Sequence, residues 1–164
     1  MKIRSDFVTN SSSSSFILAF KDDKDYKNFK EMCDDSNYSE LFDLVKKCKK
    51  KNDKDKDEII SNLRDWLIME WSNEYVLKQL PPDISFTERL KKEEEIYQSK
   101  EYAIAVDDFL ATTDYEKLKD KIQNSKIVIS DTIWDTQGGI LQYAITHGIL
   151  KSCFPWFVYQ FDNG

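Results

Sequence analysis

The chain has 164 residues, a formal net charge of −6, one histidine, three cysteines and four glycines, at positions 138, 139, 148 and 164. A single imidazole cannot build the zinc and iron sites that need two or more histidines, and these glycines cannot form the glycine-rich fingerprints that bind nucleotides. The acidic balance repels phosphate backbones, so we expect no nucleic-acid partner.

The first predicted element is a buried strand over Ser14–Phe20, where β-favouring apolar residues follow a run of five serines. Serine hydroxyls compete for backbone hydrogen bonds, so residues 1–13 are expected to form a flexible arm ahead of one globular domain, 14–164. The alternative function of the tract is modification. Its candidate acceptors are Ser11, Ser12, Ser13, Ser14 and Ser15.

Four helices are predicted from apolar residues that recur every three or four positions. They cover 23–34, 39–50, 57–80 and 113–124, and the third ends before Pro81-Pro82. Between the third and the fourth, Ser85 and Glu88 form a capping box at the start of a further helix. The apolar stripe of that helix is narrow (Phe86, Leu90, Tyr97), so we expect it to be largely exposed.

The segment Tyr102–Val106 is interpreted as a strand that joins the helix over 113–124 and the strand Lys126–Ser130 in a strand, helix, strand unit. The two strands would then be parallel. The alternative continues the preceding helix through Ala103, Ala105 and Leu110. The sequence pattern leaves both interpretations open.

The strand interpretation would place three aspartates at the carboxyl ends of neighbouring strands, where open α/β sheets bind ligands. They are Asp107, Asp108 and Asp131. Carboxylate oxygens suit Mg²⁺, and a bound metal could position a phosphate or a water molecule for hydrolysis. The alternative is that these aspartates are ordinary turn and helix-cap residues.

Near the end of the chain, residues 140–149 fit a helix or a strand, and the aromatic run Phe154–Phe161 predicts a terminal strand. At a sheet edge this strand could accept a strand of another protein or of a second subunit. Its candidate interaction residues are Phe154, Trp156, Phe157 and Tyr159. Core packing is the alternative role for these side chains.

The opening segment Arg4-Ser5-Asp6-Phe7-Val8-Thr9-Asn10 runs into Ser11–Ser15 and Phe16-Ile17. This RxDFVTNSSSSSFI pattern resembles the start of many uncharacterised bacterial proteins whose remaining sequences differ widely. The likeness covers about a tenth of the chain. It implies a bacterial, cytoplasmic origin and brings no activity or catalytic residue with it.

Together these patterns predict an α/β or α+β fold, a single domain in which several helices pack on a small mixed sheet of three or four strands. The odd number of cysteines without a C-x-x-C pair indicates the cytoplasm. We expect no membrane segment and no export signal. The favoured function is non-enzymatic binding of a protein partner or self-association, without a cofactor. The alternative is a magnesium-dependent phosphate hydrolase.

Overall fold

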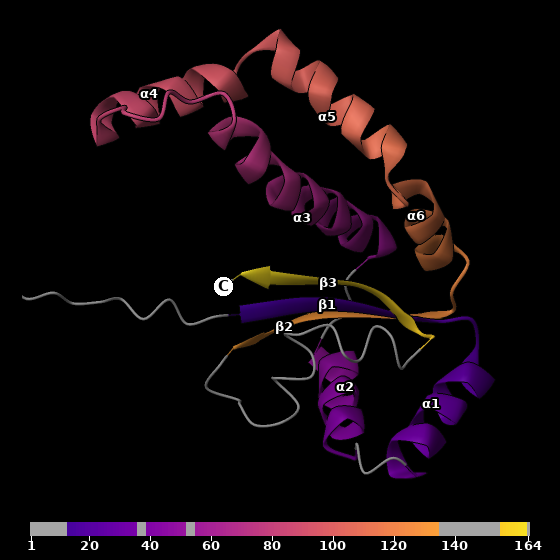
Figure 1. Ribbon diagram of the computed structural model, residues 1–164. Helices are drawn as coiled ribbons and strands as arrows, with labels where there is room; N and C mark the ends of the chain where they lie inside the picture. Colours follow the sequence, from indigo (N-terminus) through magenta and orange to yellow (C-terminus); the bar gives the residue numbers. More distant parts are fainter. Residues whose placement is uncertain (1–12, 36–38, 52–54, 135–154, 164) are drawn as a thin grey trace, which may run out of the picture. The chain divides into compact units, whose positions relative to one another are not determined.

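The computed structural model of the chain describes residues 13–35, 39–51, 55–134 and 155–163 (Figure 1). Three strands and six helices lie in these ranges: β1 (Ser13–Phe20), α1 (Asp23–Asp35), α2 (Ser39–Lys51), α3 (Lys56–Leu77), α4 (Phe86–Tyr97), α5 (Lys100–Thr112), α6 (Tyr115–Gln123), β2 (Ile127–Trp134) and β3 (Phe157–Asn163). The fold is therefore a single α+β domain with a small sheet, as predicted. The predicted element at 140–149 lies outside the described residues.

The sheet has the strand order β2-β1-β3, with β1 in the centre. Phe16 lies opposite Asp131 of β2 and Gln160 of β3, and Ile17 lies opposite Ser130 and Tyr159. Residues of β1 are buried on both faces of the sheet, which explains why this strand is a continuous apolar run rather than an alternating one.

The sheet differs from the predicted mixed sheet, because every strand pair in the described residues is antiparallel. The predicted strand Tyr102–Val106 is wrong: it lies in helix α5. Ser99 caps this helix, its Oγ accepting a hydrogen bond from the amide of Tyr102 at 3.1 Å. Tyr102, Val106 and Phe109 then follow one another at helical spacing, and Val106 is buried.

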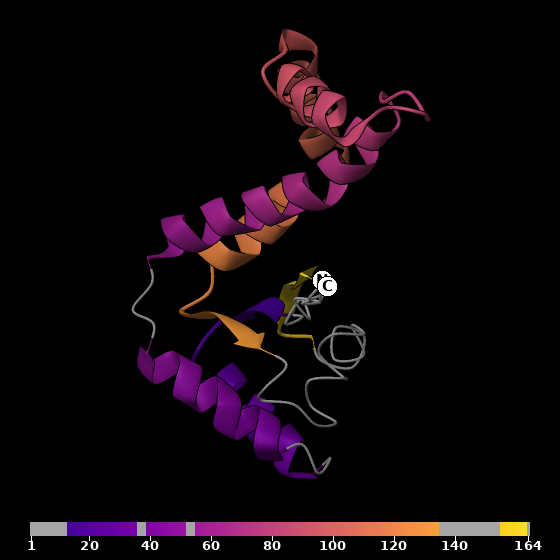
Figure 2. The same cartoon turned by 90° about the vertical axis from the view of Figure 1, so that its left-hand side faces the viewer.

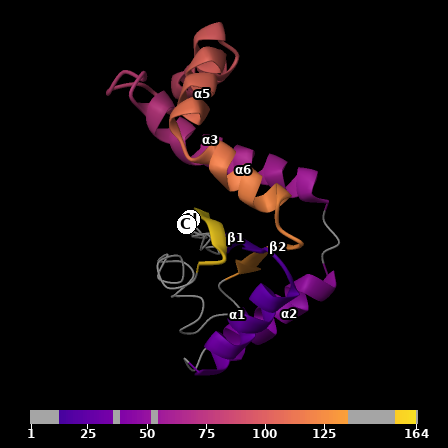
Figure 3. The same ribbon diagram turned by 90° about the vertical axis from the view of Figure 1, so that its right-hand side faces the viewer.

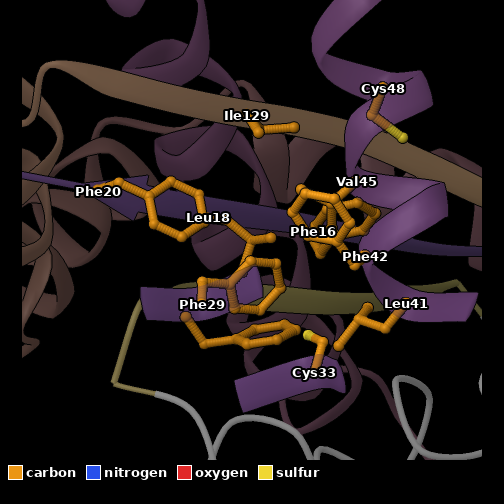
Figure 4. Close-up of a cluster of buried hydrophobic side chains, with 11 residues drawn as sticks. Phe16, Leu18, Phe20, Phe29, Cys33, Leu41, Phe42, Val45, Cys48 and Ile129 are labelled. Atoms are coloured by element: carbon orange, nitrogen blue, oxygen red, sulfur yellow. The ribbon is translucent and has the colours of Figure 1, made fainter. Parts of the chain in front are cut away.

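One face of the sheet packs against α1 and α2, which lie on the same side of it in all three views (Figures 1, 2 and 3). Phe16, Leu18 and Phe20 of β1 contribute the centre of this core (Figure 4). The helices add the apolar residues that their periodicity predicted: Phe29 and Cys33 from α1, and Leu41, Phe42, Val45 and Cys48 from α2. Both cysteines are buried packing residues of this core.

Contacts divide the domain into two compact units. The sheet unit comprises residues 1–59 and 121–164, and the helical unit comprises residues 60–120. Within the sheet unit, Lys56 Nζ donates hydrogen bonds to the carbonyl oxygens of Gln123 and Ser125, at 3.0 and 2.6 Å. Lys121 Nζ donates to the carbonyl oxygens of Pro155 and Phe157.

Aromatic rings connect the helices of the helical unit. The indole of Trp71 in α3 stacks on Phe109 in α5, with ring centroids 4.9 Å apart and planes 12° from parallel. Tyr97 of α4 meets Tyr102 of α5 edge-on at 5.2 Å. All helices of this unit lie within the described ranges, and none in those ranges is long and apolar enough to cross a bilayer.

Candidate interaction surface

The three aspartates predicted to hold magnesium do not lie together at the carboxyl ends of neighbouring strands, which the prediction required. Asp107 and Asp108 are exposed on α5, and Asp131 lies in β2 opposite Phe16. Because residues 102–106 are helical, no pair of parallel strand ends brings these carboxylates to one edge. Within the described ranges, no group of three or more His, Cys, Asp or Glu side chains could hold a metal ion.

The aromatic residues of the last strand belong mainly to the core. β3 lies at an edge of the described sheet, but Phe157 and Tyr159 are buried, and the partly buried Trp156 packs against the core. Their burial favours the alternative role of these side chains, core packing, whereas pairing of the β3 edge with another strand stays a prediction. Trp156 meets Phe20 and Phe29 at centroid distances of 6.1 and 5.5 Å. Phe154 lies outside the described residues.

The serine tract is divided between a strand and a segment that the structure does not describe. β1 begins at Ser13, the last residue of the predicted arm 1–13, and the rest of that arm, residues 1–12, lies outside the described residues. Ser15 is buried, with its Oγ 2.8 Å from Oγ1 of Thr132 on the neighbouring strand β2. The hydroxyl of Ser15 therefore links two strands of the sheet and is not exposed as an acceptor for modification.

The largest exposed apolar side chain of the described residues is on α4. Phe86 is 75% exposed, Leu90 is 50% exposed and Tyr97 is 43% exposed. At roughly 100° per residue these three side chains lie within about 40° of one another around the helix axis. None of the residues of α4, all of which the structure describes, is buried. With Leu77 of α3, which is 52% exposed, they form what we call the α4 patch.

A groove of about 370 Å³ runs beside this patch, between the end of α3 and α4. Asn73, Val76 and Leu77 contribute the wall on α3, and Arg89, Glu93 and Tyr97 contribute the wall on α4. The groove therefore has apolar and amphipathic side chains at one end and two charged side chains beside them.

The charged wall of the groove is held in place by an ion pair. Arg89 Nε donates a hydrogen bond to Oε1 of Glu93 at 2.7 Å, across one turn of the helix. The start of α4 is fixed by the predicted capping box, which the structure confirms between Ser85 and Glu88. Hydrogen bonds from Ser85 lower the pKa of the Glu88 carboxyl. Burial, with Tyr102 and Glu93 nearby, raises the pKa of Tyr97.

Charge is unevenly distributed along α4. Its first seven residues include Arg89, Lys91 and Lys92 with only Glu88 opposing them, whereas Glu93, Glu94 and Glu95 follow without a base. A helix has a partial positive charge at its N-terminus and a partial negative charge at its C-terminus, so acidic residues are favoured early and basic residues late. The order in α4 is the reverse, which its own helix dipole does not favour.

The sequence indicated this surface only in part. The spacing of Phe86, Leu90 and Tyr97 predicted an exposed helix with a narrow apolar stripe, and the structure confirms both features. What the sequence analysis missed is the contribution of Leu77 and the groove beside Tyr97, which depend on how α3 and α4 approach each other. The sequence did carry one sign of an exposed surface: no other predicted element was expected to pack against the apolar stripe of this helix.

Comparison with known proteins adds no relative: no protein-family model, no curated protein and no solved structure matches the chain. The resemblance of residues 4–17 to the start of uncharacterised bacterial proteins remains a prediction.

Proposed function

We propose that this chain is a non-enzymatic interaction protein that binds another protein chain on the α4 patch. The observation that carries the proposal is that α4 exposes Phe86, Leu90 and Tyr97 on one face and buries none of its residues. Contiguous apolar side chains on a surface, bordered by charged ones, are typical of protein–protein interaction sites.

The energetics favour two anchors within the patch. Complete burial of a phenylalanine or leucine side chain contributes about 1.5–3 kcal/mol, and interfaces depend on a few such central residues. Phe86 and Leu90 have the most apolar area left to bury on α4, because they are its most exposed large apolar residues. Arg89 and Glu93 would border them as the polar rim.

We also propose a cytoplasmic location. Cys33 is a buried cysteine with a free thiol in the described part of the chain. Burial and the charge of Asp34 raise the pKa of the Cys33 thiol to about 12, so it stays protonated and unreactive. Free thiols of this kind suit a reducing compartment.

The proposal is tested by replacing Phe86 with the photoreactive residue benzoylphenylalanine in the full-length protein, expressed in its native cells. The replacement keeps an aromatic ring at the surface. The matched control carries the same residue in place of Ile104 on α5, which is 62% exposed and lies outside the patch. Irradiation should join the first variant to one defined protein, identified by mass spectrometry.

The expected result is a strong cross-linked product from position 86 and a weak, heterogeneous background from position 104. Equal labelling from both positions, or no product from position 86, would contradict the proposed function.

A further inference from the structure

We propose that Lys121 closes the outer edge of β3, so that β3 of a second copy cannot extend the sheet there. This inference concerns the sheet unit and does not rest on the α4 patch. Three features of residues 155–158 carry it: the backbone carbonyl groups that Lys121 occupies, a proline, and an extra residue in the strand.

The backbone at the start of β3 has acceptors that face away from the rest of the sheet. Among the described strands, β3 pairs with β1 alone. The amide of Ala19, which follows Leu18 in β1, donates a hydrogen bond to the carbonyl oxygen of Trp156 at 2.9 Å. Successive carbonyl groups of an antiparallel strand point to opposite sides. The carbonyl group of Phe157 therefore points outward, where a further strand would pair.

Lys121, near the end of α6, occupies this acceptor and a second one beside it. Its Nζ donates hydrogen bonds to the carbonyl oxygens of Phe157, at 3.3 Å, and Pro155, at 2.8 Å. The amides of an added strand would need the same oxygens, so that strand would displace the ammonium group and enclose it without partners. The free-energy cost of enclosing an unpaired charge exceeds the contribution of two backbone hydrogen bonds.

Two further features make this part of the edge unsuitable for strand pairing. Pro155 has no amide hydrogen to donate. The register between β3 and β1 shifts between Ile17 and Leu18, which leaves Val158 as an extra residue of β3. An extra residue bends and twists a strand, and lysines, prolines and such bulges are features by which proteins protect sheet edges. The inference therefore opposes the strand addition predicted from the aromatic run, over residues 155–158.

The inference is tested with Lys121→Met and a matched control, Lys56→Met, both in the full-length protein. Lys56 Nζ also donates two hydrogen bonds to backbone carbonyl oxygens, those of Gln123 and Ser125, at 3.0 and 2.6 Å. Gln123 ends α6 and Ser125 precedes β2, so neither lies in a strand. Both substitutions remove the same kind of contact, but only Lys121→Met opens the edge of β3.

Sedimentation velocity at increasing concentration measures self-association. Each variant is held at the same interval below its own melting temperature, so that the unfolded fraction is similarly small. We expect Lys121→Met to raise the self-association constant about tenfold or more above that of the wild type, and Lys56→Met to leave it unchanged. Far-ultraviolet circular dichroism reports whether each variant folds. If Lys121→Met does not fold, Lys121→Gln and Lys56→Gln replace the pair.

Hydrogen exchange followed by mass spectrometry locates the contact. In associated Lys121→Met, the amides of residues 155–163 should exchange more slowly than in its monomer, and those of α4 should not change. Equal association of both variants, no association of Lys121→Met, or slower exchange only outside residues 155–163 would each overturn the inference. None of these outcomes alters the cross-link from position 86, which tests the proposed function separately.

Discussion

In the sheet unit the apolar side chains are used to build a core, whereas in the helical unit many of them remain at the surface. Phe16, Leu18, Phe20 and Phe29 of the sheet unit are almost completely buried. In the helical unit, all of whose residues the structure describes, the buried apolar side chains are Ile60, Leu63, Val76 and Val106. The rings of Trp71, Tyr75, Tyr102 and Phe109 are only partly buried.

This difference separates a unit whose apolar side chains stabilise its own fold from one that leaves several apolar side chains at the surface. A buried apolar side chain is already stabilising its own fold, so it has little left to offer a partner. An exposed apolar face on a helix with a firm cap and an internal ion pair is ordered and still available.

Truncation of the core should have the largest effect. Phe29→Ala removes a ring that contacts Phe20, Phe42 and Trp156, so we expect a loss of about 3–5 kcal/mol of unfolding free energy. Urea denaturation followed by circular dichroism measures the change. Ile104→Ala, at an exposed position, is the control and should change stability by less than about 0.5 kcal/mol. A similar loss in both variants would contradict the division between the units.

Removal of the Lys121 ammonium should have an intermediate effect. Lys121 Nζ donates hydrogen bonds to the carbonyl oxygens of Pro155, at 2.8 Å, and Phe157, at 3.3 Å, and burial lowers its pKa. Lys121→Met leaves both carbonyl groups without this donor, so a loss of about 1–3 kcal/mol is expected in the same assay. Lys117→Met, which removes only an exposed ion pair with Asp114, should have almost no effect.

Alkaline pH should weaken the sheet unit through Cys33. Its thiol has a pKa of about 12 in the folded protein, whereas the unfolded chain releases this proton near its ordinary value of 9.0. The folded state therefore binds the proton more tightly, and its stability falls as the pH rises above 9, by at most about 1.4 kcal/mol per pH unit from this group. The stability advantage of the wild type over Cys33→Ala should shrink between pH 8 and pH 10.5. A constant difference would show that Cys33 does not titrate abnormally.

The smallest effect on stability is expected at the α4 patch itself. Leu90→Ser changes a half-exposed side chain on a helix with no buried residue, so the unfolding free energy of the isolated chain should change by less than about 0.5 kcal/mol. A loss above 2 kcal/mol would show that Leu90 belongs to a core, and the contrast with Phe29 would disappear.

Much of this fold could be predicted from the sequence because the apolar periodicity of several elements is unambiguous. Each of three patterns fits only one type of secondary structure: the apolar stripes of α1 and α2 fit helices, and the continuous apolar run of β1 fits a buried strand. The segment Tyr102–Val106 does not, because alanine favours a helix while isoleucine and valine favour a strand. Two features decide in favour of a helix. Ser99 caps its start, and Phe109 stacks on Trp71 of α3 within the helical unit.

The candidate surface could be predicted less well, for a physical reason. An apolar stripe can be read from spacing, but the sequence does not say whether another element of the same chain covers it. For the C-terminal aromatic run the answer was burial, as Phe157 and Tyr159 show, and for α4 it was exposure.

The position of β1 also has a consequence for folding during synthesis on the ribosome. Its two neighbours in the sheet come more than 100 residues later in the chain. During synthesis the apolar strand β1 stays unpaired until β2 and β3 emerge from the ribosome. Pairings between segments that lie far apart in the sequence form slowly. The hydrogen bonds of Lys56 to Gln123 and Ser125 join the two ends of the intervening stretch. Early folding of residues 60–120 would therefore reduce the length of unfolded chain between β1 and β2, so that the two strands pair sooner.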